Sequence, residues 1–192
     1  HQPDMIILPG TKSTIADLRW LRQCGLEAAI HKAADAGTLV FGVCGGYQML
    51  GRTVSDPEQV EAAGTTEILG MGLLEMDTIF LGEKVQAQTT GVFAGISGVL
   101  SDLNGMSYSG YEIHMGRSEE EMPALAGTGN VYGSYVHGVF DASGISDTIL
   151  KALCVRKGID FDALETFDIS EYKEYQDDLL ADAVRSGLDM EF

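Results

Sequence analysis

A short apolar run that ends in a cysteine between glycines constrains the fold of this chain more than any other feature. Residues 39–43, Leu-Val-Phe-Gly-Val, are typical of a buried strand. Cys44-Gly45-Gly46 follows directly, and a helix can begin there. A strand, a tight turn of the form G-x-nucleophile-x-G and a helix make up a nucleophile elbow. The pattern therefore predicts that Cys44 lies at the carboxyl end of a strand, where α/β sheets keep their sites.

The first fifty residues alternate between strand and helix patterns. Residues 5–8 form a second apolar run, which ends at Pro9-Gly10. Residues 14–17, Thr-Ile-Ala-Asp, match a capping box at a helix start, and Gly25 interrupts that helix. A second helix runs from about residue 26 to Gly37. This alternation predicts an α/β fold with a mostly parallel central sheet flanked by helices.

The middle of the chain, residues 53–110, is rich in Gly, Thr and Val, which predicts a smaller antiparallel β region. The other patterns predict strands at 111–115 and 131–136, a loop at 123–130, and helices at 146–155 and 170–186. No internal repeat or flexible linker divides the sequence, so we expect one domain over residues 1–192.

The charge of the chain excludes several classes of partner. Twelve Lys and Arg residues against 29 Asp and Glu residues give a formal net charge of −17. Nucleic acids and anionic membrane surfaces are bound by clustered basic side chains, and the sequence has no basic patch. No apolar run has the length of a membrane span. We therefore expect neither nucleic-acid nor membrane partners.

The chain has three cysteines, which cannot all pair with one another. They form no C-x-x-C pair and no Cys/His cluster with zinc spacing, so we expect no metal site and no disulfide scaffold. Cys24 and Cys154 are interpreted as packing residues. Because no disulfide scaffold is expected, we also expect the protein to lie in the reducing cytoplasm. The sequence shows no signal peptide and begins at His1 without an initiating Met. This start indicates a piece of something longer, or a trimmed chain.

Cys44 is the candidate nucleophile, because the amino end of the following helix favours its thiolate. His137 follows the strand predicted at 131–136, so it can meet Cys44 at the same sheet edge as a base. His114 is the competing candidate. A buried structural cysteine and a strand-end histidine are the alternative interpretation. The backbone N–H groups of Gly45 and of the loop at 9–11 are candidate donors to an oxyanion. Residues 10–13 resemble a phosphate loop, but their spacing is wrong for one.

Four blocks of this sequence resemble, in order, the signature blocks of the glutaminase domain of the cobyric acid synthase family. They are residues 8–14, 42–51, 110–116 and 132–141. The resemblance implies a class I glutamine amidotransferase with a flavodoxin-like fold, which hydrolyses glutamine through a thioester on Cys44. It implies His137 as the base and Gly10 and Gly45 as oxyanion donors. It also implies that Gln48, Tyr111 and His114 line the glutamine pocket.

The resemblance further implies a division of labour in a longer protein. The glutaminase domain itself would need no cofactor. Its ammonia would pass to an N-terminal ATP-dependent synthetase domain, which is absent from this chain and would use ATP and Mg²⁺. That domain would amidate adenosylcobyrinic acid a,c-diamide in cobalamin biosynthesis.

The sequence departs from the wider amidotransferase pattern at Val139, where many class I members have a glutamate that orients the histidine. The third member of a triad therefore stays open, with Glu112 and Asp141 as candidate orienters. Three other interpretations stay open as well. They are the glutaminase of a related amidotransferase (cobyrinic acid a,c-diamide synthase or a peptidoglycan-amidating type), a thiol hydrolase of another kind on the same fold, and a decayed domain kept for docking.

Overall fold

The computed structural model describes residues 2–61, 64, 66–118, 123–142, 144–164 and 169–187. The chain divides into two compact units, residues 1–153 and 154–192. The second unit contains the last residues of helix α4 (Ile145–Lys157), a 3₁₀ turn at Phe161–Ala163 and helix α5 (Ile169–Gly187). The prediction that residues 1–192 form one domain stays a prediction.

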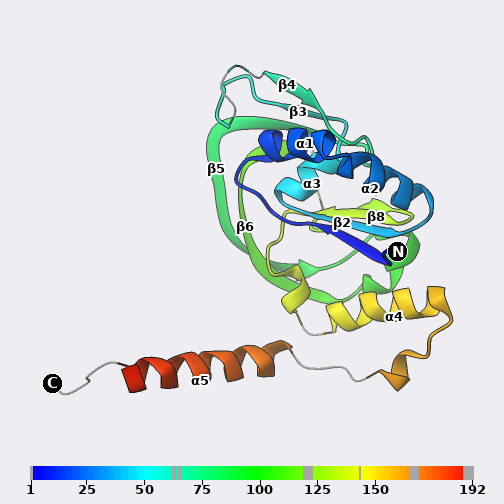
Figure 1. Cartoon of the computed structure of the whole chain (residues 1–192), viewed down its shortest axis with the longest axis vertical. Helices are drawn as coiled ribbons and strands as arrows, with labels where there is room; N and C mark the ends of the chain where they lie inside the picture. Colours follow the sequence, from blue (N-terminus) through cyan, green and yellow to red (C-terminus); the bar gives the residue numbers. More distant parts are fainter. Residues whose placement is uncertain are drawn as a thin grey trace. The chain divides into compact units, whose positions relative to one another are not determined.

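A four-stranded sheet with the order β1-β2-β8-β7 lies at the centre of the first unit (Figure 1). Its strands are β1 (Met5–Leu8), β2 (Leu39–Val43), β8 (Val131–Ser134) and β7 (Ala126–Thr128). The first three are parallel, and β7 pairs with β8 in the antiparallel sense. The loop predicted at 123–130 is therefore wrong in part, because residues 126–128 join this hairpin.

Helices cover both faces of this sheet, as the alternation predicted. They are α1 (Thr14–Gln23), α2 (Leu26–Asp35), α3 (Gly45–Leu50), α4 and the 3₁₀ helices η1 (Gly98–Leu103) and η2 (Val139–Asp141). Val40 of β2 belongs to the core formed with α1, α2 and α3, whereas Leu39 and Phe41 belong to the core formed with η1 and α4. Among the described residues, no helix combines the length and the apolar character needed to cross a membrane.

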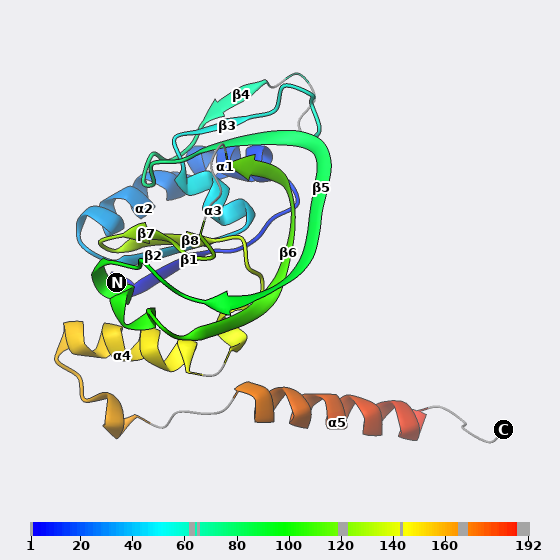
Figure 2. The same cartoon turned by 180° about the vertical axis from the view of Figure 1, so that it is seen from behind.

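The second sheet has the order β4-β3-β5-β6 and confirms the predicted β region in the middle of the chain. Its strands are β3 (Thr53–Ser55), β4 (Glu67–Leu69), β5 (Asp77–Val92) and β6 (Ser107–Ser118). The long strands β5 and β6 pair in the antiparallel sense and arch around one side of the parallel sheet (Figures 1 and 2). Strand β6 meets the segment after β8 through a bridge between Tyr111 and His137.

The start of α1 differs from the predicted capping box. Ser13 is the N-cap residue and makes no side-chain capping bond. Two N–H groups of the first turn are bound instead by Glu61, from the loop after β3. Its carboxylate accepts from the N–H of Thr14 and from the N–H of Ile15, the latter at 3.1 Å. A residue 47 positions away thus supplies the cap that the local sequence pattern assigned to residues 14–17.

Candidate active site

Cys44 occupies the elbow that the sequence predicted. It follows β2 directly, and its backbone has φ 50° and ψ −110°, a conformation that non-glycine residues rarely adopt. Its N–H donates to the carbonyl of Ser134 at the end of β8 (2.8 Å), and its carbonyl accepts from the N–H of Gln48 (3.0 Å). The strained turn is therefore anchored to the parallel sheet on one side and to α3 on the other.

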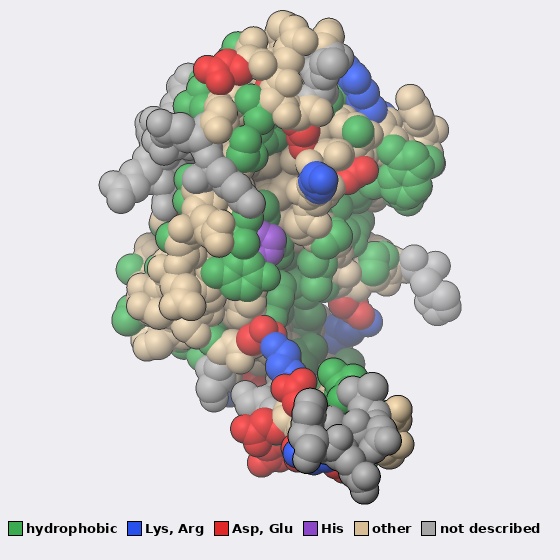
Figure 3. All heavy atoms as spheres, turned by 90° about the vertical axis from the view of Figure 1, so that its left-hand side faces the viewer, with side chains coloured by type: hydrophobic (Ala, Val, Ile, Leu, Met, Phe, Trp, Pro, Cys, Tyr) green, Lys and Arg blue, Asp and Glu red, His purple; other side chains and the backbone are tan. Residues whose placement is uncertain are grey.

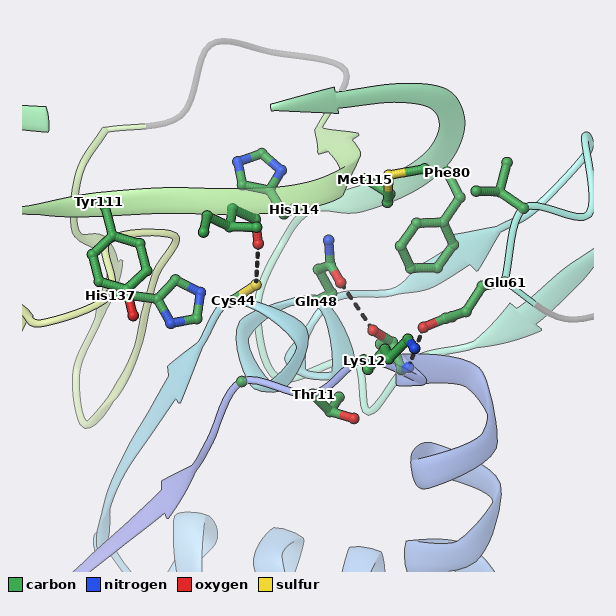
Figure 4. A pocket seen from close by; sticks show the side chains of 14 residues that line it. Thr11, Lys12, Cys44, Gln48, Glu61, Phe80, Tyr111, His114, Met115 and His137 are labelled. Atoms are coloured by element: carbon green, nitrogen blue, oxygen red, sulfur yellow. Dashed lines mark hydrogen bonds between the residues drawn. The ribbon is translucent and has the colours of Figure 1, made fainter. Parts of the chain in front are cut away.

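Cys44 opens into a cavity of about 670 Å³. The lining comes from the loop after β1 and the start of α1, the elbow and α3, the loop after β3, the strands β5 and β6, and the segment after β8. It consists of Gly10, Thr11, Lys12, Thr14, Cys44, Gln48, Val60, Glu61, Phe80, Tyr111, Ile113, His114, Met115 and His137. Figure 3 shows a histidine in a hollow of the surface beside hydrophobic side chains, and Figure 4 shows the cavity from close by.

His137 is held in the cavity by strand β6. Its N–H donates to the carbonyl of Tyr111 (2.8 Å), and its ring stacks on the Tyr111 ring with centroids 5.1 Å apart and planes 6° apart. Its buried Nε2 atom has no hydrogen-bond partner among the described residues. Figure 4 shows the imidazole between Tyr111 and Cys44. An unpartnered nitrogen of this kind is available to accept a proton.

The side chains of Cys44 and His137 converge above Gly10. A Cβ atom built on Gly10 would lie 2.9 Å from Cε1 of His137 and 3.5 Å from Cβ of Cys44. The first distance is shorter than real Cβ contacts, so a side chain at position 10 would push the imidazole away. The structure therefore brings together the predicted nucleophile, the predicted base and Gly10.

The surroundings of Cys44 and His137 favour the uncharged form of each group. Burial raises the pKa of the Cys44 thiol above 9.0, and the charge of Glu112 adds to this, while a bond from the Gly45 N–H opposes it. The Cys44 thiol donates to the carbonyl of Ile113 on β6 (3.5 Å). Burial, and then His114, lower the pKa of His137 below 6.5. Burial therefore opposes the predicted preference for a thiolate, which stays a prediction.

Gly45 faces the loop after β1, as predicted for a pair of oxyanion donors. A Cβ atom on Gly45 would lie 2.6 Å from Cγ2 of Thr11 and 3.1 Å from its backbone N. A side chain at position 45 would therefore push against that loop. The Gly45 N–H points to the Cys44 sulfur, to which it bonds. The roles of Gly10 and Gly45 as oxyanion donors stay a prediction.

Gln48 lies on α3 one turn after the nucleophile and is 2% exposed. Its Oε1 accepts from the Thr14 hydroxyl (3.1 Å), whereas its Nε2 is buried without a hydrogen-bond partner among the described residues. The accepted bond fixes the amide so that its NH₂ group stays free for another acceptor. This is a property expected of a residue that holds a polar ligand.

His114 and Glu112 lie together on β6, on the other side of the cavity from α3. His114 stacks on Tyr135 with centroids 4.1 Å apart, and its Nε2 lies 3.4 Å from Oε2 of Glu112. Among the described residues, Glu112 contacts His114 and forms no hydrogen bond or ion pair with His137, so its role as orienter of His137 stays a prediction. Cys154 is buried as predicted, whereas Cys24 is exposed, and its interpretation as a packing residue was wrong.

Sequence reasoning missed Glu61 and Phe80, which both line the cavity. Neither belongs to a motif with a fixed spacing. Glu61 lies in a loop, and Phe80 lies on β5 just before a register shift in the β5–β6 pairing. Such residues reach the site only through the tertiary arrangement of the second sheet, so no local signal could have found them.

Comparisons with known proteins point to one family. Residues 1–145 match the family model described as "CobB/CobQ-like glutamine amidotransferase domain". The chain is 50% identical to a cobyric acid synthase of Lachnoclostridium phytofermentans and 45% identical to one of Ruminiclostridium cellulolyticum, over 98% and 99% of its length. It spans about 40% of the length of these relatives. A solved glutamine amidotransferase structure shares the fold, with a TM-score of 0.50 at 17% identity over 81% of this chain and 80% of that one.

Proposed function

Since the chain belongs to the family of CobB/CobQ-like glutamine amidotransferase domains, we propose that its cavity hydrolyses the side-chain amide of glutamine and releases ammonia. The observation that carries this proposal is the convergence of Cys44 and His137 above Gly10. A thiol in a strained elbow and a buried imidazole with a free nitrogen are the two groups that thiol acyl transfer needs. We propose residues 1–192 as one glutaminase domain.

The first half of the reaction forms a thioester. His137 takes the proton of the Cys44 thiol as the sulfur bonds to the amide carbon of glutamine. The carbonyl oxygen becomes an oxyanion, for which the N–H groups of Gly45 and Gly10 are the proposed donors. The imidazolium then gives its proton to the amide nitrogen, the carbon–nitrogen bond breaks and ammonia leaves. The low pKa of His137 supports this last step, because a weakly basic imidazole gives up its proton readily.

The second half releases glutamate. His137 takes a proton from a water molecule as the water oxygen attacks the thioester carbonyl. The carbon–sulfur bond breaks, and the sulfur recovers the proton from the imidazolium. Gln48, Tyr111 and His114 are the proposed binding residues for the substrate, and the free NH₂ group of Gln48 supports its part in this. Glu112 remains the proposed orienter, acting by way of His114.

We place this chain in cobalamin biosynthesis, as the glutaminase part of a cobyric acid synthase. Its relatives of that name support this role over a cobyrinic acid a,c-diamide synthase or a peptidoglycan-amidating enzyme. The ammonia would serve an ATP- and Mg²⁺-dependent synthetase domain N-terminal to this segment, which amidates adenosylcobyrinic acid a,c-diamide. The cytoplasm is the proposed location, because its reducing environment keeps free thiols from forming disulfides.

The direct test is covalent labelling with a diazo-ketone analogue of glutamine. The Cys44 sulfur would bond to the carbon that bears the diazo group, N₂ would leave, and the thiol proton would end on that carbon. Mass spectrometry of the digested protein should locate the label on Cys44. A label on Cys24, which is exposed, or on Cys154 instead would contradict the assignment.

A further inference from the structure

The cavity has a carboxylate at the end away from the reactive pair. Among the described residues that line the cavity, Glu61 is the only one with a carboxylate. Figure 4 shows Cys44 and His137 on one side of Gln48, and Glu61 on the other side with Lys12 and Phe80. The reactive end and the carboxylate end are therefore opposite ends of one cavity.

The Glu61 carboxylate is held firmly but is not saturated. One oxygen accepts from the N–H of Thr14 and the other from the N–H of Ile15 (3.1 Å). These bonds place the carboxylate at the amino end of the ten-residue helix α1, which favours a negative charge. The Thr14 side chain also forms a hydrogen bond to this carboxyl. A carboxylate has about four acceptor positions, so about one of them stays free.

The surroundings of Glu61 leave its charge incompletely balanced. Burial is the largest cause that raises the pKa of this carboxyl, and the charge of Asp56 adds to it, while the hydrogen bonds from Thr14 and Ile15 oppose it. In the described part of the chain, no Lys, Arg or His nitrogen forms an ion pair with Glu61. A cation that enters the cavity would therefore gain from contact with this carboxylate.

The groups next to Glu61 are donors. The Gln48 amide nitrogen is buried and has no hydrogen-bond partner among the described residues. The oxygen of the same amide accepts from the Thr14 hydroxyl, and the backbone N–H of Thr14 donates to Glu61. Lys12 adds an exposed ammonium group to the lining. One anion beside a neutral donor and a cation is the complement of a zwitterion that carries one ammonium and one carboxylate group.

We propose, on the basis of the proposed function, that Glu61 binds the α-ammonium group of glutamine and sets the specificity of the cavity. Gln48 and Lys12 then face the α-carboxylate, and the side-chain amide extends to Cys44. Under this arrangement the cavity selects amides of free α-amino acids and rejects an amide of the same length that lacks the amino group.

The test compares two probes on this chain: the diazo-ketone analogue of glutamine, and the same diazo-ketone without its α-amino group. The rate constant for labelling Cys44 is measured for each by mass spectrometry. The wild-type chain should prefer the amino probe by about tenfold to a hundredfold, the value of one hydrogen bond to a charged group. Glu61→Gln should remove most of this preference by slowing the amino probe alone, and Glu61→Asp should retain part of it.

Glu58→Gln is the matched control. Glu58 lies three residues before Glu61, is exposed, accepts from the N–H of Gly82 (3.1 Å) and does not line the cavity, so this variant should keep the full preference. Equal labelling of Cys44 by iodoacetamide in Glu61→Gln and wild type would show that the elbow is intact.

Two results overturn the inference and leave the proposed function standing. One is labelling of Cys44 in the wild-type chain at the same rate by both probes. This result does not depend on whether any variant folds. The other is an unchanged preference in Glu61→Gln. If neither probe labels Cys44 in the wild-type chain, the proposed function fails, and this inference fails with it.

Discussion

The parallel sheet and the β5–β6 pair of the second sheet contribute to the cavity in different ways. The parallel sheet carries Cys44 directly after β2 and His137 three residues after the end of the adjacent strand β8. The residues of both strands are almost all buried. Strand β6 covers the cavity from outside, and its Tyr111 and Ile113 are 48% and 36% exposed. The proposed chemistry therefore depends on the core, whereas the fine position of the imidazole depends on a more exposed wall.

The largest effect should come from the core side, at the nucleophile. In a full-length enzyme that carries the synthetase domain, Cys44→Ser should reduce glutamine-dependent amidation to background, because a serine hydroxyl is a far poorer nucleophile than a thiol here. Amidation with free ammonia should continue. Cys24→Ser, at an exposed position, is the control and should leave both activities unchanged. Loss of both glutamine-dependent and ammonia-dependent amidation in Cys44→Ser would indicate that Cys44 has a structural role instead.

The same contrast explains what the sequence could predict. The elbow at Cys44, the strand before it and the helices around Gly25 follow from local patterns of apolar residues and glycines, and the structure confirms them. The cap of α1 could not be predicted, because Glu61 reaches Thr14 from 47 residues away. Strand β7 was predicted as a loop, since its three residues become a strand only by pairing with β8.

The convergence above Gly10 predicts a strong effect of one methyl group. Gly10→Ala should slow labelling of Cys44 by the diazo-ketone about a hundredfold, because the new Cβ would lie 2.9 Å from Cε1 of His137 and displace the ring. Kinetics of labelling, followed by mass spectrometry, would measure this. Gly187→Ala, at the end of α5, is the control, because a Cβ atom there would meet no other atom within 4 Å. Gly95→Ala is not suitable, because the φ of Gly95 is 74° and a side chain would strain the backbone there. Unchanged labelling in Gly10→Ala would show that the position of His137 does not matter for the reaction of Cys44.

On the wall side, removal of the Tyr111 ring should have a smaller effect. Tyr111→Ala loses the stacking on His137 but keeps the backbone bridge, so labelling should slow by about twofold to tenfold. The thermal midpoint should change little, since Tyr111 is half exposed. Val92→Ala, an exposed position on β5 that does not line the cavity, serves as the control. A loss as large as that of Gly10→Ala would contradict the division between core and wall.

The smallest effect concerns the protonation of His137. Burial, and then His114, lower its pKa below 6.5, so less than half of this imidazole should be protonated at pH 6.5. The midpoint can be read from the pH dependence of its ring resonances by NMR, assigned with His137→Gln. Because the unfolded chain binds this proton more readily, His137 should lower the free energy of unfolding slightly as the pH falls through 6.5. A midpoint above 6.5 would instead show that a carboxylate acts on the ring, and Glu112, which lies 3.4 Å from His114, would then be the first candidate.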